Sequence, residues 1–435
     1  MASNNLFDNP NASLEDWLSY LETIHSTEID LGLARITKVA QRLQCHLKNV
    51  KVITVAGTNG KGTTCAFLEN ALLSKGFKVA VYSSPHIHRF NERLRINKAE
   101  IDDAPLIAAF NQIEKARKEI SLTYYEYTTL AAFIIMQSLA LESLLDYAIL
   151  EVGLGGRLDA TNMIDADIGV ITSIDLDHQA FLGDTRELIG IEKAGILRTG
   201  KPAVVGEKNL PAKVLSHIEQ LGCELTLRGQ AFDLTTTEQG WLYQFEGRSF
   251  EYQKPHIPVD NVATALTVLS KLAIGFEHDE INALIENTKV PGRTQLISTA
   301  PDVICDVAHN PHAARHLANF VANYQCQHTS QKPKQVHAVV GMLSDKDIKG
   351  TIATMMVQVD HWYVAGLDIP RGASAEQLSQ SIQELGIVST NKSASVNAFD
   401  NIEQAYTIAT DQAGEGDLVV VFGSFFTVAE IPGVL

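Results

Sequence analysis

Residues 55–64 read VAGTNGKGTT and join an apolar run to a segment with helical periodicity. The run KVITVA at 51–56 predicts a strand, and Cys65, Leu68 and Leu72 share one face of the helix that follows. A strand, a glycine-rich turn and a helix start direct backbone amides towards one point, which favours an anion. This stretch therefore predicts an α/β fold whose first loop can bind phosphate.

The spacing of this loop departs in two ways from the common nucleotide-binding pattern GxxxxGK[ST]. Only two residues separate Gly57 from the Gly-Lys pair, and Gly62 separates the lysine from Thr63. The alternative is a plain strand-to-helix turn, in which the glycines serve only close packing. Phosphate binding is favoured because Lys61 supplies a positive charge for the β- and γ-phosphates, and Thr63 or Thr64 supplies a hydroxyl near magnesium.

Short apolar runs alternate with helix-like segments from residue 50 onward, which predicts an α/β protein. Because these runs are continuously apolar, we expect a parallel sheet covered on both faces. Residues 210–256 mix polar and β-prone residues and predict an antiparallel excursion. The further strands of the first domain are expected at FKVAVYS (77–83), DYAILEV (146–152), DIGVITSI (167–174) and KPAVVG (201–206).

A second domain is expected after VPGRTQ (290–295), where a proline and a glycine end a helical stretch and a short polar segment follows. We expect a P-loop-type, parallel-sheet ATPase domain at 1–297 and a smaller, Rossmann-like α/β domain at 298–435. Strand-like runs separated by helical segments support the second domain. They are VICDVAH (303–309), VHAVVGM (336–342), HWYVAGL (361–367) and DLVVVFGS (417–424).

The composition narrows the class of partner and the compartment. The net charge is −16, with 51 acidic against 35 basic residues, which argues against a nucleic-acid partner. The five cysteines are scattered and form no CxxC pair, so we expect reduced thiols in a cytoplasmic protein. The start of the chain lacks the pattern of a secretory signal. The apolar run at 129–145 is interrupted by Gln137, Ser138 and Glu142, which predicts a buried helix and no membrane partner.

Polar side chains follow two further strands of the predicted sheet. Glu151 comes directly after the run YAIL, and Asp175, Asp177 and His178 come after GVITSI. Since the carboxyl ends of parallel strands line the ligand crevice of an open sheet, we expect a divalent-cation site there. The alternatives are a surface acid at the end of a strand and a hydrogen-bonded structural histidine. The glycines of GLGG (153–156) resemble a dinucleotide fingerprint but lack its full spacing.

Other residues gain no firm role from the local pattern alone. Lys193 in GIEKAGI reads as a solvated lysine on a helix. Asp306 and His309 follow the first strand of the second domain, which is again a crevice position, and Arg293 at the domain junction could hold phosphate. The tyrosines of LTYYEY (122–127) are either core residues or a stacking platform for a flat heteroaromatic ring.

Taken in order, a set of motifs along the chain resembles the folylpolyglutamate synthase family of the Mur ligase superfamily. The motifs are VAGTNGKGTT, SSPH, LTYYEY, EVGLGGRLDATN, SIDLDHQAFLG, EKAGI, PGR, DVAHNPHAA and GSF. The resemblance runs from about Trp17 to the C-terminus and is greatest to the bifunctional bacterial members, in which GTNGKG[ST] is the usual nucleotide loop. It implies a Mur ligase-like fold and an ATP-dependent ligase that adds L-glutamate to dihydropteroate and to tetrahydrofolate derivatives through an acyl phosphate.

The resemblance also implies a role for each matching position. ATP, as co-substrate, would be bound by Gly57, Asn59, Gly60, Lys61, Gly62, Thr63, Asn261, Arg293 and Asp306. Two Mg²⁺ ions, with Mn²⁺ as an alternative, would be bound by Ser84, Glu151, His178 and a carbamylated Lys193. The pterin substrate would be bound by Asp30, Leu31, Gly32, Thr123, Tyr124, Tyr125 and Glu126. Lys61, Lys193, Asp306 and His309 would be catalytic, the last two by placing the reacting groups and glutamate.

Two positions depart from the family pattern. Phe426 stands where histidine is common, and Gln179 follows His178 where threonine or methionine is common. Three alternatives stay open, namely a monofunctional folylpolyglutamate synthase, a peptidoglycan-precursor ligase of the same superfamily and an ATP-binding regulatory module without catalysis. The tyrosines of LTYYEY favour a pterin over a nucleotide-sugar substrate. We expect a monomer whose partners are small molecules.

Overall fold

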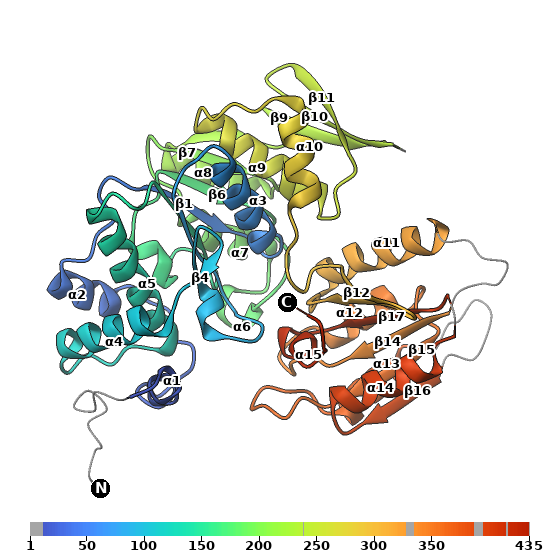
Figure 1. Ribbon diagram of the computed structural model, residues 1–435. Coiled ribbons are helices and arrows are strands. Elements are labelled where there is room, and N and C mark those ends of the chain that lie inside the picture. Colours follow the sequence, from blue (N-terminus) through green and yellow to red (C-terminus); the bar gives the residue numbers. More distant parts are fainter. Residues whose placement is uncertain (1–11, 238, 328–334, 387–394, 415, 435) are drawn as a thin grey trace, which may run out of the picture. The chain divides into compact units, whose positions relative to one another are not determined.

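The computed structural model describes residues 12–237, 239–327, 335–386, 395–414 and 416–434. The chain divides into two compact units, Met1–Thr288 and Lys289–Leu435 (Figure 1). This division falls before the boundary expected at 297–298. The reason is β12 (Gln295–Thr299), which pairs antiparallel with β13 (Asp302–Asp306) and so belongs to the second sheet. The ligands expected for each domain remain predictions.

The first unit is built on an eight-stranded sheet in the order β4-β3-β2-β5-β1-β6-β7-β8. Strands β2, β5, β1, β6, β7 and β8 run parallel, and β3 and β4 form an antiparallel edge. The bounds are β1 (Lys51–Ala56), β2 (Val79–Tyr82), β3 (Leu94–Ile96), β4 (Ala99–Glu100), β5 (Tyr147–Glu151), β6 (Ile168–Ile171), β7 (Pro202–Val205) and β8 (Glu224–Leu227). The predicted α/β class with a parallel sheet is therefore confirmed.

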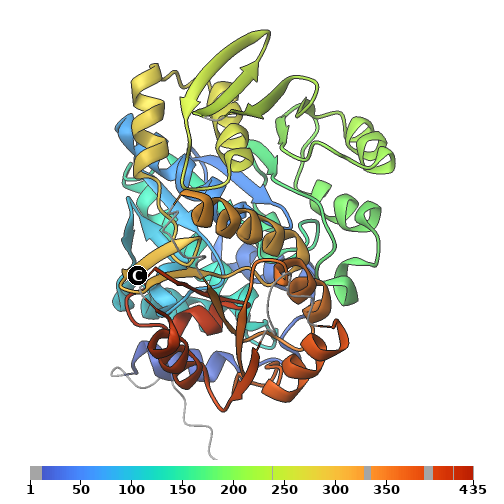
Figure 2. The same ribbon diagram turned by 90° about the vertical axis from the view of Figure 1, so that its right-hand side faces the viewer.

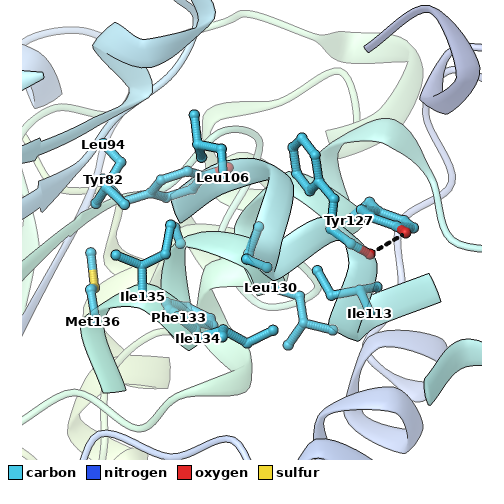
Figure 3. Packing of buried hydrophobic residues seen from close by; sticks show 14 of the residues in the cluster. Tyr82, Leu94, Leu106, Ile113, Tyr127, Leu130, Phe133, Ile134, Ile135 and Met136 are labelled. Atoms are coloured by element: carbon cyan, nitrogen blue, oxygen red, sulfur yellow. Dashed lines mark hydrogen bonds between the residues drawn. The ribbon is translucent and has the colours of Figure 1, made fainter. Parts of the chain in front are cut away.

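Helices cover this sheet because its strands are apolar on both faces. On one side, α4 (Asp103–Arg117) and α5 (Tyr124–Leu141) pack into a core with β2 and β3, as Figure 3 shows for Tyr82, Leu94, Leu106 and Leu130. The buried helix predicted at 129–145 lies largely within α5. None of the helices in the described part of the chain is long and apolar enough to cross a membrane.

The remaining elements of the first unit surround this core. They are α1 (Leu14–Leu21), α2 (Ala34–Leu43), α3 (Lys61–Ser74), α6 (Gln179–Leu182), α7 (Arg186–Ala194), α8 (Ala212–Leu221), α9 (Val259–Lys271), α10 (His278–Asn287), β9 (Phe232–Thr236), β10 (Gly240–Phe245) and β11 (Arg248–Gln253). The antiparallel excursion expected at 210–256 is confined to 232–253, where β9, β10 and β11 form a three-stranded sheet. The first part of the expected range is instead helix α8 and the parallel strand β8 of the main sheet. In Figure 1 and Figure 2 its β10–β11 hairpin lies at the opposite end of the first unit from α1.

The second unit has a six-stranded sheet in the order β12-β13-β17-β14-β15-β16, parallel except for β12. Its further elements are β14 (Val336–Val340), β15 (His361–Ala365), β16 (Ser395–Phe399), β17 (Leu418–Phe422), α11 (Pro311–Gln327), α12 (Ile348–Met355), α13 (Ala375–Glu384), α14 (Ile402–Gln412) and α15 (Phe425–Ala429). The four predicted strands are present. The edge strands β12 and β16 were not predicted, because they are less apolar than the central ones.

A buried histidine is expected to make the second unit less stable in acid. His337 on β14 contacts the Tyr363 hydroxyl at 3.0 Å, and burial lowers its pKa, helped by His361 and opposed by Asp417 and Asp360. Because the folded-state pKa lies below the unfolded value, the unfolded chain binds the proton more readily and stability falls as pH drops below about 6.5. We expect the denaturant midpoint of His337→Gln to fall less steeply than the wild-type midpoint between pH 7.5 and 5.5. Parallel midpoint curves would contradict this.

Candidate active site

The glycine-rich loop follows β1 and leads directly into α3. Gly60 is the N-cap of α3 and has a left-handed backbone with φ +85°, and no side chain caps the helix through a hydrogen bond. A Cβ on Gly60 would lie 2.3 Å from Oδ1 of Asn261 on α9, so glycine is needed for both backbone and space. The first turn of α3 therefore presents its amides at the carboxyl end of the sheet, as an anion site requires.

Residues after β6 hold this loop in place. The Thr172 hydroxyl donates to the Asn59 carbonyl at 2.6 Å, and the Asn59 amide donates to the Ser173 hydroxyl at 3.0 Å. A Cβ on Gly57 would lie 1.8 Å from Oγ1 of Thr172. The short glycine spacing of the loop is thus matched to the neighbouring strand. Thr172 and Ser173 were not predicted as site residues, although both stand in the strand run GVITSI.

Glu151 lies against the start of α3. It ends β5, where Val55 is its partner on β1, and its side chain is buried. A Cβ on Gly62 would lie 3.7 Å from both carboxylate oxygens of Glu151. On the same helix turn, Lys61 Nζ donates to the Gly57 carbonyl at 2.9 Å, and Thr63 is buried. The first turn of α3 and the end of β5 therefore place a lysine and a carboxylate at the same edge of the sheet.

Lys193 is buried on α7, contrary to the local expectation of a solvated lysine. Burial lowers its pKa to about 7, and the positive charge of Lys61 acts in the same direction, against Asp177 and Asp159. A lysine in this state exchanges readily between ammonium and neutral amine near neutral pH. The electrostatic coupling to Lys61 links it to the phosphate-binding loop.

The glycines of 153–156 allow this segment to pack closely against Tyr125 and α7. A Cβ on Gly153 would lie 2.6 Å from the Tyr125 ring, and a Cβ on Gly156 would lie 2.8 Å from the Glu192 carbonyl and 3.1 Å from the Lys193 Cα. The amide of Arg157 also donates to the Glu192 carbonyl at 2.8 Å. The segment after Glu151 is therefore pressed against α7. This accounts for the glycines without a dinucleotide.

Three of the predicted metal ligands lie at the carboxyl ends of parallel strands, of which β2 and β5 are adjacent and β6 is separated from β5 by β1. Ser84 follows β2, Glu151 ends β5, and His178 follows β6 as the N-cap of α6. The His178 amide donates to Asp177 Oδ1 at 2.8 Å. Among the described residues, no three His, Cys, Asp or Glu side chains form a group that could hold a metal ion. A divalent ion here would therefore need oxygen from the Ser84 hydroxyl, from phosphate or from a modified Lys193, which suits the preference of Mg²⁺ for mixed oxygen ligands.

The predicted pterin residues fall into two segments of the first unit. Thr123 is the N-cap of α5 and forms a capping box with Glu126. The Tyr125 hydroxyl accepts from the Gly153 amide at 3.0 Å and donates to Asp159 at 3.3 Å. Tyr124 lies under the Arg93 guanidinium, 5.5 Å from the ring centroid. The helix therefore sends the tyrosines in different directions.

A single stacking platform of three tyrosines is not formed. Tyr127 is fully buried in the core, and its hydroxyl donates to the Phe110 carbonyl at 3.0 Å. In the second segment, which precedes α2, Asp30 is paired with Arg35 and Leu31 packs on the core around β6 and β7. A Cβ on Gly32 would meet nothing within 4 Å.

The predicted residues of the second unit cluster at the end of β13. The buried Asp306 accepts from the Thr294 amide at 2.8 Å and from the Ala308 amide at 2.8 Å. Burial raises the pKa of Asp306, and the charge of Arg293 opposes the rise. His309 Nδ1 lies 2.8 Å from the Val307 carbonyl.

Four other predicted or divergent positions lie in different parts of the fold. The Arg293 guanidinium lies 5.5 Å from the centroid of the Phe425 ring. The divergent Phe426 is half exposed on α15, and Gln179 begins α6. Asn261 instead contacts the loop of the first unit at Gly60.

Gly57→Ala should damage the fold of the loop as well as its function. The added methyl would overlap the Thr172 hydroxyl, so we expect a loss of roughly 1–3 kcal/mol in the free energy of unfolding and weaker ATP binding. Gly62→Ala is the matched control, because its methyl would sit in helix α3 at ordinary contact distance from Glu151. Thermal melting and ATP titration of both variants check this, and equal melting temperatures would count against the steric account.

Comparisons with known proteins agree with this geometry. Residues 55–208 match the Mur ligase middle domain, and residues 292–425 match the Mur ligase glutamate ligase domain. A dihydrofolate synthase/folylpolyglutamate synthase of Escherichia coli K12 is 45% identical over 97% of this chain and 95% of its own length.

Two solved structures are similar over most of the chain. The E. coli FolC complex with DHPP and ADP has a TM-score of 0.87 at 45% identity, covering 96% of each chain. A bifunctional folylpolyglutamate synthase/dihydrofolate synthase with Mn, AMPPNP and L-glutamate bound has a TM-score of 0.86 at 45% identity, covering 96% of this chain and 97% of its own.

Proposed function

Because this chain belongs to the dihydrofolate synthase/folylpolyglutamate synthase family of Mur ligases, we propose that it uses ATP to attach L-glutamate to dihydropteroate and to reduced folates. The observation that carries the proposal is the glycine-rich loop with Lys61. At the carboxyl end of a parallel sheet, the loop leads into the turn of α3 that lies beside the buried Glu151. The relatives supply the substrate class, since one was solved with DHPP and ADP and another with L-glutamate.

The reaction forms an amide in two steps. The carboxylate of dihydropteroate, or of the terminal glutamate of a folate, attacks the γ-phosphorus of ATP, and ADP leaves with the electrons of the broken bond. The amine of L-glutamate then attacks the acyl phosphate, loses a proton and expels phosphate. The amides at the start of α3 and the Lys61 ammonium offset the charge on the phosphoryl group in the first step.

Ser84, Glu151, His178 and Lys193 would hold the divalent ions, Mg²⁺ or the Mn²⁺ found in a relative. When bound, these ions neutralise phosphate charge and orient the acceptor oxygen. Lys193 would add an oxygen ligand only in a modified form, and a neutral lysine amine can add to carbon dioxide to give a carbamate and a proton. We therefore include a carbamylated Lys193 in the proposal, supported by its burial and its pKa of about 7.

The acceptor substrate would lie along Asp30, Leu31 and Gly32 and the first turn of α5, Thr123, Tyr124, Tyr125 and Glu126. Asp306 and His309 of the second unit would place the glutamate and the reacting groups. Arg293 and Asp306, together with Asn261 beside the loop, would contact ATP. The protein would act as a cytoplasmic monomer, which fits its acidic composition and scattered cysteines.

A side-by-side assay tests the function. ADP release is measured with ATP, Mg²⁺ and L-glutamate, using dihydropteroate in one series and tetrahydrofolate in the other. Turnover in both series is expected from the bifunctional enzyme, and turnover with tetrahydrofolate alone would indicate a monofunctional folylpolyglutamate synthase. No glutamate-dependent ADP release with either acceptor would overturn the proposal and favour the peptidoglycan-precursor alternative.

A further inference from the structure

Arg35 joins the two segments proposed to hold the pterin. From the first turn of α2, its Nη1 donates to Asp30 Oδ2 at 2.6 Å and its Nη2 donates to the Asp30 carbonyl at 2.6 Å. Its Nε donates to Glu126 Oε2 at 3.3 Å. One planar guanidinium thus fixes both the backbone and the carboxylate of Asp30 relative to α5. A cation in the first turn of a helix opposes the helix dipole, so packing of α2 alone does not favour arginine here.

One carboxylate oxygen of Glu126 is not bonded to Arg35. Glu126 is 3% exposed, and its Oε2 accepts from Arg35 and, at 2.8 Å, from the Thr123 amide. Its Oε1 is buried, and the described residues provide it with no hydrogen-bond partner. Buried carboxylate oxygens are normally satisfied by the protein, by ordered water or by a ligand, so Oε1 calls for a donor from water or a ligand. An N–H group of a heteroaromatic ring is a donor of the required kind.

The loop that carries Asp30 is also fastened from its other side. His25 Nε2 lies 3.3 Å from Asp30 Oδ2, and His25 Nδ1 lies 2.6 Å from the Ser121 hydroxyl, just before α5. The Ser121 hydroxyl donates to the Ile24 carbonyl at 3.0 Å. Residues 24–30 are therefore tied to residues 121–126 by side chains at both ends, and Arg35 is the member that touches both carboxylates.

We propose that Arg35 is a positioning residue for the pterin substrate, which sets the distance between Asp30 and Glu126. The inference rests on the proposed function, because it assigns the pterin to this site. It predicts that Arg35 governs binding of the acceptor and has no direct part in binding ATP.

Arg42 provides a matched control on the same helix. Its side chain is 33% exposed against 28% for Arg35, and it donates to the carbonyls of Ala116 and Arg117 and to Glu119 at 2.8–3.0 Å. It fastens α2 to the end of α4 with as many hydrogen bonds as Arg35 makes, but it contacts neither Asp30 nor Glu126. A purely structural role of Arg35 would therefore give Arg35→Ala and Arg42→Ala the same consequences.

The test compares Arg35→Ala, Arg35→Lys and Arg42→Ala in the full chain. We expect Arg35→Ala to raise the KM and the Kd for dihydropteroate at least tenfold, with KM for ATP changed less than twofold, because hydrogen bonds to a charged group are lost. Arg35→Lys should recover only part of the affinity, since lysine cannot make the forked contacts. Hydrogen–deuterium exchange of residues 24–33 should rise in Arg35→Ala and stay at the wild-type level in Arg42→Ala.

Separate outcomes decide the inference and the proposed function. An unchanged Kd for dihydropteroate in a folded Arg35→Ala or Arg35→Lys variant overturns the role of Arg35, as does an equal loss in Arg42→Ala. Wild-type protein that binds dihydropteroate but releases no ADP contradicts the proposed function, and a weaker Kd in the Arg35 variants then still supports the inference. Wild-type protein that binds no dihydropteroate contradicts both.

Discussion

Replacing Lys193 by alanine is expected to lower ADP-forming turnover on the order of a thousandfold, the scale on which loss of an essential electrostatic group acts. The side chain is buried within electrostatic reach of Lys61, and a carbamate there would turn a second cation into an oxygen donor for the divalent ion. Short carboxylic acids such as acetate should restore part of the activity of Lys193→Ala, because they return the missing carboxylate to the vacated space.

A carbamate on Lys193 also predicts that the activity of the wild-type protein depends on pH and bicarbonate. Only the neutral amine reacts with carbon dioxide. With a pKa of about 7, the fraction of Lys193 in this neutral form increases as pH rises through 7. Wild-type protein depleted of bicarbonate should therefore regain activity faster at pH 8 than at pH 6. Lys201→Ala is the control, since that lysine is half exposed and pairs with Asp167. Absence of both chemical rescue and a carbamate in the intact mass would remove Lys193 from the metal site.

Lys61→Ala has the second large expected effect, a fall in kcat of roughly a hundred- to a thousandfold with intact folding. The Nζ group donates to the Gly57 carbonyl at 2.9 Å, and the substitution removes its positive charge from the start of α3. Loss of this charge also removes one of the two causes that lower the pKa of Lys193. The bicarbonate response should therefore shift towards higher pH.

Lys75→Ala is the matched control for Lys61, because Lys75 ends the same helix and pairs with Glu280 away from the loop. Its ADP release should equal that of the wild type. A Lys61→Ala variant that kept full turnover would instead favour the ATP-binding module without catalysis. Measuring kcat and KM for ATP separately distinguishes lost transition-state stabilisation from lost nucleotide affinity.

Much of the fold could be predicted because it follows from local pattern. The apolar runs before Gly57 and Glu151 and around Val170 specify buried parallel strands, and their order along the chain implies a sheet with a crevice at its carboxyl edge. The edge strands β12 and β16 escaped prediction, since an edge strand needs less apolar surface. The chain divides after Thr288, before the expected 297–298, because β12 belongs to the second sheet.

Parts of the site depended on contacts between distant segments. The residues next to Lys193 in the sequence predict a solvated side chain. In the fold Lys193 is buried on α7, against which residues 153–156 pack. Thr172 carries no signal of its own, yet its hydroxyl fixes the loop through Asn59. Arg35 likewise gains its role from Glu126, 91 residues along the chain.

The sequence by itself determined the α/β class and the reaction class implied by the ordered motifs, and it predicted a phosphate-binding loop at 55–64. These are local properties, since periodicity and backbone freedom act within a few residues. The tertiary structure alone decided which lysine is buried, which tyrosine of 122–127 belongs to the core, and which carboxylate oxygen lacks a donor. Burial, pKa and hydrogen-bond satisfaction depend on residues that folding brings together, and no local pattern encodes them.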